Sequence, residues 1–440
     1  MTALSKPADL VVSAGWVIPV EPAGEVLKNH AVVVRDGRID ALLPRDAVAD
    51  LDCKERVNLG GHVLLPGLVN AHGHAPMSLL RGYADDLSLM PWLEEHIWPA
   101  EQAHVSREFV RDGARLAIAE MILAGTTTFS DMYFFPDAVA DIVSEAGIRC
   151  QLAAPVFDFP SAWGSGADDY ISKALALRDD CKTRDRITVA FGPHAPYTVS
   201  KAALEKIATF AAELDMGVHI HLHETAGEVL SHVEAEGERP IDTLYALGIL
   251  GPRAQCVHMT DLGAQDIDTL VATGAHVIHC PQSNMKLASG TCPIARLLEA
   301  GVNVALGTDG AASNNNLNLF DEMHTAALLA KLSGEDPTVL PASEALHLAT
   351  LGGARALGLE DQIGSLAPGK AADMIAVDLS GPATQPLYNP LSQLIYACNG
   401  SEVSHSWVAG DAVLRGGRLA TLDLAETLAQ AQHWGERIRA

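Results

Sequence analysis

The stretch that decides the fold is Pro66-Gly67-Leu68-Val69-Asn70-Ala71-His72-Gly73-His74, which follows the apolar run Val63-Leu64-Leu65. In an extended segment alternate side chains point to the same side, so His72 and His74 present two imidazoles to one space. Two neutral imidazoles on one face are a usual beginning of a zinc or iron site. A His-x-His pair also occurs by chance in solvated loops, so its meaning depends on the rest of the chain.

An alternating pattern surrounds this stretch. Between about residues 64 and 365, short β-rich runs alternate with longer helical segments, which is typical of βα units and a parallel sheet. The strand candidates are 62–69, 125–131, 149–155, 187–193, 216–222, 254–258, 275–279 and 302–307. Eight such units predict a (β/α)8 barrel, in which chemistry takes place at the carboxyl ends of the strands.

Histidine or aspartate closes every strand candidate except the third. Chance placement of these residue types would not give that pattern. The residues in question are His72, His74, Asp131, His194, His219, His221, His223, His258, His279 and Asp309. We therefore expect them around one mouth of the barrel.

Several of these residues suit a metal ion. His72, His74, one histidine of the fifth strand and Asp309 give a nitrogen-rich set with one carboxylate, which suits Zn²⁺ or Fe²⁺. An ion with an open coordination position lowers the pKa of bound water. The periodicity leaves open which fifth-strand residue binds, because His219, His221 and His223 share one face.

Glu224 ends the fifth strand beside these ligands and is positioned to move a proton between water and a leaving group. A lone histidine is more often a core residue than a catalytic one. At a strand end within this set, however, we interpret His258 as assisting the water. His279 has no such neighbour, so we expect it in the core.

Both ends of the chain have a different pattern. Residues 9–62 and 372–414 contain short β-segments separated by glycine turns, and Asp36-Gly37 is a hairpin signal. Two separate β-rich extensions would each be marginal, so we expect one composite β-sandwich domain of residues 1–63 and 366–440. The last helix, about 423–439, is expected to pack on it. Residues 64–365 would form the catalytic barrel domain.

Composition limits the class of function. The net charge of −25 disfavours nucleic acid and anionic membranes as partners. No secretory signal is visible in Met1–Leu10 and no apolar stretch is long enough for a membrane span. The seven cysteines have no Cys-x-x-Cys spacing, which argues against a thiolate zinc site or a disulfide framework. We expect a cytoplasmic protein.

The motifs resemble a known family over nearly the whole chain. They are Pro-Gly-Leu-Val-Asn-Ala-His-Gly-His at 66–74, Gly-Pro-His-Ala-Pro-Tyr at 192–197, His-Leu-His-Glu-Thr at 221–225 and Gly-Thr-Asp-Gly-Ala-Ala-Ser-Asn-Asn at 307–315. The chain is similar to the amidohydrolase superfamily, in the aminohydrolase and chlorohydrolase branch. Within it, the chain looks most like the 5-methylthioadenosine/S-adenosylhomocysteine deaminases. Binuclear amide hydrolases of the superfamily place a carboxylated lysine after strand four, where this chain has His194.

This resemblance implies roles for individual residues. One metal ion per subunit, usually zinc with Fe²⁺ or Mn²⁺ as alternatives, would bind to His72, His74, His221 and Asp309. Glu224 would protonate the purine ring, His258 would help to activate the water, and Asp309 would accept a proton. His194 would bind the purine ring and Glu101 the ribose hydroxyls. The resemblance also implies a homo-oligomer.

The expected reaction is hydrolytic deamination of the adenine ring of 5'-methylthioadenosine, S-adenosylhomocysteine or adenosine. Trp92 and its apolar neighbours in 87–98 suit a flat base or a thioether tail, although they would equally anchor a helix. A homocysteine carboxylate would need an arginine, and the sequence does not place Arg178, Arg184 or Arg186. The alternatives are another flat heterocycle, such as guanine or a triazine, and a catalytically silent barrel that binds a metabolite.

Overall fold

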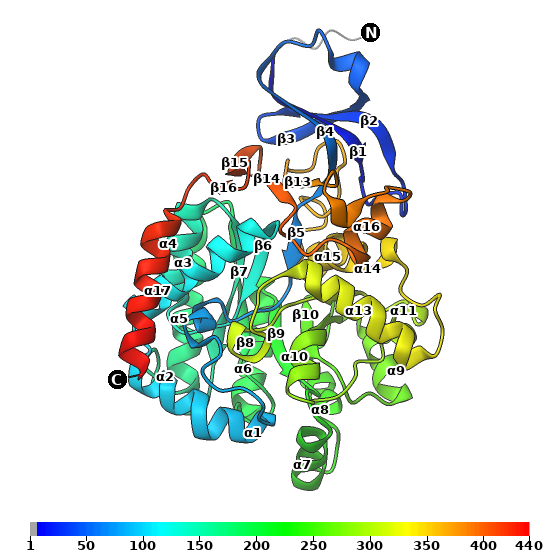
Figure 1. Ribbon diagram of the computed structural model, residues 1–440. Coiled ribbons are helices and arrows are strands. Elements are labelled where there is room, and N and C mark those ends of the chain that lie inside the picture. The colour runs from blue at the N-terminus through cyan, green and yellow to red at the C-terminus, as the bar shows by residue number, and fades with distance from the viewer. Residues whose placement is uncertain (1–6, 440) are drawn as a thin grey trace.

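The computed structural model describes residues 7–439 and centres on one sheet of eight parallel strands (Figure 1). In sheet order, which is also chain order, these are β5 Leu68–Asn70, β6 Thr126–Asp131, β7 Arg149–Val156, β8 Ile187–Pro193, β9 Val218–Leu222, β10 Ala254–His258, β11 His276–His279 and β12 Val304–Leu306. The Ala71 amide donates to the Leu306 carbonyl at 2.9 Å, which joins the two ends of the sheet. The predicted (β/α)8 barrel is confirmed.

Helices follow the strands and cover the outside of the barrel. They are α3 Arg107–Leu123, α4 Pro136–Ala146, α5 Ala167–Cys181, α6 Lys201–Leu214, α7 Ala226–Glu236, α8 Pro240–Ala246, α9 Ala264–Thr273, α10 Pro281–Lys286, α11 Ile294–Glu299, α12 Ala311–Asn314, α13 Leu319–Gly334, α14 Ala342–Leu348 and α15 Leu351–Ala356. The strands are buried on both faces, as the continuous burial of β7 shows. Their apolar side chains form the main core with those of the helices.

One insertion lies over the mouth of the barrel, between β5 and α3. It contains η2 Ala75–Leu80, α1 Leu89–Pro91, the π-helical turn η3 Trp92–Ile97 and α2 Trp98–His104. This insertion supplies the apolar segment that the sequence placed near the substrate.

The two ends of the chain meet in a second sheet of eight strands. Its order is β16 Arg418–Leu419, β15 Asp411–Arg415, β14 Val403–Val408, β13 Met374–Asp378, β4 Cys53–Pro66, β1 Ala8–Val17, β2 Leu27–Arg35 and β3 Arg38–Pro44. The sheet folds back on itself, because the Ala372 amide donates to the Gly37 carbonyl at 2.9 Å. Side chains of β1, β2, β13 and β14 share a core between its halves. The composite sandwich and its Asp36-Gly37 hairpin are confirmed.

The first barrel strand is shorter than expected. The sequence predicted a strand over 62–69, but residues up to Pro66 pair with β13 in the terminal sheet, and only Leu68–Asn70 enter the barrel. Gly67 lies at the crossing, where a Cβ atom would stand 2.0 Å from the Thr127 hydroxyl oxygen. A strand could not pass so close to its neighbour with any larger residue.

We propose that the chain forms two domains, one made of residues 1–63 together with residues 366–440, and the other made of residues 64–365.

The last helix lies elsewhere than expected. Helix α17, Leu424–Arg439, packs on α3 of the barrel instead of on the sandwich (Figure 1). Trp434 is buried there, its indole N–H donates to Asp112 at 2.8 Å, and its ring meets Phe109 edge-on. The Thr421 hydroxyl donates to the Ala146 carbonyl and so directs the chain down the side of the barrel.

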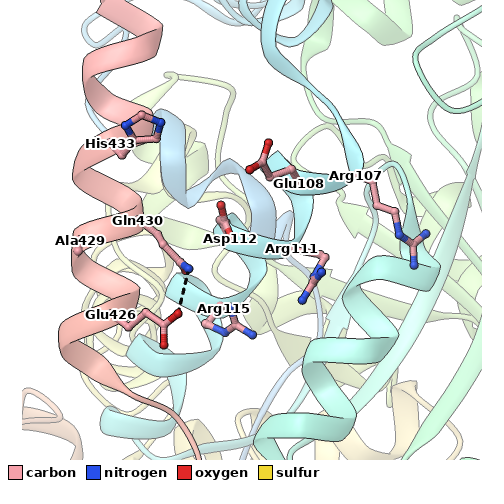
Figure 2. Close-up of a pocket in the computed structure, with 9 residues that line it drawn as sticks. All are labelled: Arg107, Glu108, Arg111, Asp112, Arg115, Glu426, Ala429, Gln430 and His433. Atoms are coloured by element: carbon pink, nitrogen blue, oxygen red, sulfur yellow. Dashed lines mark hydrogen bonds between the residues drawn. The ribbon is translucent and has the colours of Figure 1, made fainter.

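An open groove of about 840 Å³ runs between α3 and α17 (Figure 2). Arg107, Arg111 and Arg115 lie along its α3 side, and Glu426, Gln430 and His433 along its α17 side. None of the residues predicted for the site lies in it. Two of the arginines pair with acids of α4, since Arg107 contacts Asp137 and Arg115 contacts Glu145.

No helix within 7–439 has both the length and the apolar character needed to cross a membrane.

Candidate active site

The carboxyl ends of the barrel strands open into a cavity of about 660 Å³. Eight of the nine residues predicted for the site line it: His74, Trp92, Glu101, His194, His221, Glu224, His258 and Asp309. The ninth, His72, is fully buried beneath them. The structure therefore brings the whole predicted set together, seven residues from the ends of separate strands and Trp92 and Glu101 from the insertion over the mouth.

Four of these residues point ligand atoms at one small space. Nε2 of His72 lies 3.2 Å from Nε2 of His221, and it lies 3.3 Å from Oδ1 of Asp309. Nε2 of His74 also lies 3.3 Å from that oxygen. Ligands bonded at the usual zinc distances in a tetrahedron stand roughly 3.3 Å apart, so these spacings fit a zinc ion.

The hydrogen bonds behind the rings fix the tautomers. Nδ1 of His74 donates to the Met132 carbonyl at 2.6 Å, and Nδ1 of His221 donates to the His194 carbonyl at 2.8 Å. Each ring therefore turns Nε2, the nitrogen that is left to bind a metal ion, toward the shared space. Contacts of this kind orient metal-binding histidines in proteins.

His72 is oriented by a longer relay. The amide oxygen of Gln255 can only accept, so Nδ1 of His219 donates to it at 2.5 Å. Nε2 of His219 is then the acceptor for Nδ1 of His72 at 2.7 Å. As a result Nε2 of His72 faces Nε2 of His221 with lone pair toward lone pair. Because neither nitrogen has a proton to donate, this contact is not a hydrogen bond, and a cation between the two lone pairs would relieve their repulsion.

The ionisation states agree with this fit. Burial lowers the pKa of His72 and of His221 well below the ordinary value, so both rings are neutral, the form that binds metal. Burial also acts to lower the pKa of His74, but the adjacent Asp309 carboxylate raises it to about 9. Asp309 thus attracts a positive charge where a metal ion would stand. Its own pKa lies well below the usual range, because these histidines outweigh the effect of burial.

Asp309 is held by its own turn. Its backbone has φ of +62°, a left-handed conformation that is uncommon outside glycine, and α12 begins two residues later. Ser283 and Ser313 donate to its second oxygen, Oδ2, at 2.6 and 2.9 Å. The first oxygen is thereby turned to the metal-binding histidines.

Glu224 and His258 face each other across the cavity, with the carboxylate oxygen 3.8 Å from Nε2 of the ring. Burial raises the pKa of Glu224, although the nearby His258 opposes the shift. A carboxyl group with a raised pKa holds its proton more readily, so it can act as a general acid as well as a general base. Nδ1 of His258 donates to the Asn284 side-chain oxygen at 2.9 Å, so Nε2 is left as an acceptor.

His194 and Glu101 lie on the substrate side of this centre. The His194 ring stacks on Phe157 at 5.0 Å, and burial lowers its pKa to about 3, so it is neutral. Glu101 on α2 accepts a hydrogen bond from the Tyr133 hydroxyl at 2.6 Å. Desolvation raises the pKa of Glu101 to about 7.

Trp92 occupies a position that is compatible with both interpretations of its sequence context. Its ring lines the cavity, and its indole N–H donates to the Ala84 carbonyl at 3.2 Å, which anchors the insertion. The three arginines considered for a homocysteine carboxylate do not line the cavity. Arg184 instead pairs with Asp141, and Arg186 pairs with Asp411.

The remaining strand-end residues do not line the cavity. His223 turns away, since its ring contacts the Asp261 carbonyl and the Ile241 amide, so the expectation that it shares a face with His219 and His221 is wrong. Asp131 accepts from the Ala75 amide at 2.6 Å, next to the His74 loop. His279 is buried as expected, although neither ring nitrogen has a hydrogen-bond partner within 7–439.

Sequence reasoning missed the residues that position the predicted ones. Tyr133 follows Asp131 by two residues and could have been found by extending the second strand end. Ser313 lies within the motif at 307–315 but was given no role. Ser283 and Gln255 gave no signal, because their role depends on contacts between separate βα units. Phe134, Phe157 and Phe159 also line the cavity and were not singled out.

Comparison with known proteins gives consistent results. The Amidohydrolase family model matches residues 63–413. A 5-methylthioadenosine/S-adenosylhomocysteine deaminase of Teredinibacter turnerae is 50% identical over 433 residues, which are 98% of each chain. A 5'-deoxyadenosine deaminase of Methanothermobacter thermautotrophicus is 44% identical, over 90% of this chain and 92% of that one. An adenosine deaminase of Xanthomonas campestris, whose crystal structure has bound zinc, superimposes with a TM-score of 0.97 at 49% identity over 99% of both chains. This chain belongs to the amidohydrolase family.

Proposed function

We propose that this chain is a zinc-dependent hydrolase that deaminates the adenine ring of 5'-methylthioadenosine, S-adenosylhomocysteine and related adenine nucleosides, giving the inosine analogue and ammonia. One observation carries this proposal: the Glu224–His258 pair stands beside a metal-binding set, in the same cavity as Glu101 and the aromatic wall. The names of the relatives at 44–50% identity support the same chemistry.

The metal would be held by His72, His74, His221 and Asp309. When bound, a zinc ion with an open coordination position lowers the pKa of water and supplies a nucleophile near neutral pH. His258 offers Nε2 to the attacking water and orients it. Asp309 accepts the proton that this water loses as its oxygen bonds to the amino-bearing carbon of the ring.

Glu224 provides the second proton transfer. In its protonated form, which burial favours, it donates to the ring nitrogen next to the attacked carbon. The proton taken from water then moves to the amino group, and the carbon–nitrogen bond breaks to release ammonia. As the new carbonyl forms, its hydroxyl proton returns to Glu224, which is then ready for the next turnover. His194 stacks beside the ring, and Glu101 is placed to accept hydrogen bonds from ribose hydroxyls.

The test is ammonia release together with the ultraviolet change from adenine to hypoxanthine, measured with the zinc-loaded protein. We expect turnover of methylthioadenosine and adenosine and little turnover of guanine or a chloro-triazine. Glu224→Gln should lower kcat by roughly 10²–10⁴-fold, the usual contribution of general acid–base catalysis. Glu95→Gln, at an exposed residue outside the cavity lining, is the matched control and should have no effect.

Two outcomes would contradict the proposal. Turnover of a free base or a triazine alone would keep the hydrolytic chemistry and overturn the substrate. A protein that binds no stoichiometric zinc and stays inactive after zinc is added would favour a catalytically silent barrel. The homo-oligomer implied by the family remains a prediction, which light scattering after size-exclusion chromatography tests.

A further inference from the structure

The cavity that receives the substrate has acids among its lining residues but no lysine or arginine, within the residues that the structure describes. Its carboxylates are Glu94 at the mouth, Glu101, Glu224 and Asp309. The chain as a whole carries a net charge of −25, so apart from the zinc ion proposed at Asp309 no positive background offsets them. A negatively charged group on a substrate would therefore be repelled by these carboxylates.

Two lysines that lie near segments of the cavity wall are already paired. Lys286, next to the lining residue Leu287, contacts Asp85 at 2.6 Å. Lys173 lies over the Trp163 ring and contacts Asp169 at 2.8 Å. Withdrawing either lysine to bind a ligand would leave its aspartate without that partner. Neither is set up to receive a carboxylate from the substrate.

An apolar path leads outward from the ribose-binding position. Tyr133, which donates to Glu101, is followed by Phe134 at 5.2 Å, Phe157 at 5.8 Å and Phe159 at 4.9 Å, each distance joining neighbouring ring centres. We call these four residues the aromatic row. It ends at Phe159, which is 42% exposed, beside Ala162 on the same rim. Thioether sulfur makes favourable contacts with aromatic rings, so the row suits an uncharged thioether tail.

We propose that this cavity prefers adenine nucleosides whose 5' substituent is uncharged over those, such as S-adenosylhomocysteine, whose tail carries a carboxylate. This inference rests on the proposed function and narrows its substrate class. The 5' substituent would lie along the aromatic row, where a thioether is well accommodated. A tail carboxylate would lose water and find no cation, which is costly in a site of low polarity.

Three 5'-thioadenosines with tails of matched length test the proposal: butylthio (neutral), 3-carboxypropylthio (anionic) and 3-aminopropylthio (cationic). With the zinc-loaded full-length protein we expect kcat/KM for the neutral tail to exceed that for the anionic tail at least tenfold, about 1.4 kcal/mol. The cationic tail should rank above the anionic one. Raising the salt concentration should narrow the difference, because the repulsion is electrostatic. Calorimetric Kd values of the matching thioinosine products should follow the same order, independently of turnover.

A matched pair of variants tests whether the 5' substituent of the substrate ends near Ala162. Ala162→Arg should raise the anionic-to-neutral ratio of kcat/KM several-fold, whereas Ala162→Gln, of similar length but uncharged, should leave that ratio unchanged. Equal kcat/KM for the neutral and anionic tails would overturn the inference, and so would equally poor turnover of all three long tails while methylthioadenosine reacts. Absence of turnover for every adenine nucleoside, methylthioadenosine included, would instead overturn the proposed function.

Discussion

Glu101 offers the sharpest test of how the nucleoside is held. Within the described residues, the Tyr133 hydroxyl donates a hydrogen bond to Oε1 of its carboxylate, which leaves Oε2 to the cavity. A hydrogen bond to a charged group contributes about 1.5–3 kcal/mol, and each 1.4 kcal/mol is tenfold in an equilibrium. Glu101→Gln should therefore lower kcat/KM for methylthioadenosine or adenosine by roughly 10- to 150-fold.

The control substrate is 2',3'-dideoxyadenosine, which lacks both ribose hydroxyls. Glu101→Gln should change its kcat/KM by less than about twofold, because the substituted residue has no hydroxyl partner there. Tyr133→Phe keeps the carboxylate and removes only its donor, so it should cost adenosine less than the Glu101 change does. An equal loss on adenosine and on the dideoxy substrate, or no loss on adenosine, would refute the assignment to the ribose.

The pH dependence gives an independent reading of the same residue. The pKa of Glu101 is raised to about 7, so the carboxylate, the stronger acceptor, forms as the pH rises through neutrality. The ratio of kcat/KM for adenosine to that for its dideoxy analogue should therefore rise between about pH 6 and pH 8. In Glu101→Gln the ratio should be flat over this range. A rise that persists in the variant would assign the titration to another group.

Three further predictions concern the scaffold. Gln255→Leu removes the far end of the histidine relay and should weaken zinc affinity about 10- to 100-fold in a chelator competition, whereas Gln265→Leu on the exposed face of α9 should not. Arg149 forms two hydrogen bonds with the Asp373 carboxylate in a buried ion pair between barrel and sandwich. Arg149→Met would leave that carboxylate without its partner and should lower the free energy of unfolding, measured in urea, by roughly 3–5 kcal/mol. The control Arg184→Met, in an exposed pair, should lower it by less than about 1 kcal/mol. Burial raises the pKa of Asp131 to about 7, so its contribution to stability is complete below its unfolded pKa near 4 and is lost as the pH rises through 7. Asp131→Asn should therefore remove up to about 4 kcal/mol of the pH dependence of stability, measured by thermal melts at graded pH. An unchanged pH profile of stability would contradict this prediction.

The sequence predicted the barrel well because a parallel strand buried on both faces leaves a continuous apolar run. Seven of the eight strands appear within about two residues of the expected limits at each end. The first strand failed for a local reason. Val63-Leu64-Leu65 is equally apolar whether it pairs with β13 or with a barrel strand, and only the close approach at Gly67 decides between the two.

The last helix shows a different limit. Its apolar face was visible in the sequence, but such a face does not specify its partner. The decisive contacts, Trp434 with Asp112 and Phe109, join residues more than three hundred positions apart. A pattern within one segment carries no information about such pairs.

The turn after the fifth strand decides which of the neighbouring side chains face the cavity. A period of two puts His219, His221 and His223 on the inner face and would put Glu224 outside. That rule holds only while the strand lasts, and β9 ends at Leu222. His223 then has φ of +52°, a left-handed conformation that reverses the direction of the following side chains. His223 is thereby turned out to Asp261, and Glu224, whose amide is held by Glu228 at 2.7 Å, is turned into the cavity. His258 and Asp309 also have positive φ, at +76° and +62°, at the ends of their strands. Periodicity therefore locates the ends of the strands, and the residues with left-handed backbone at those ends decide which side chains face the cavity.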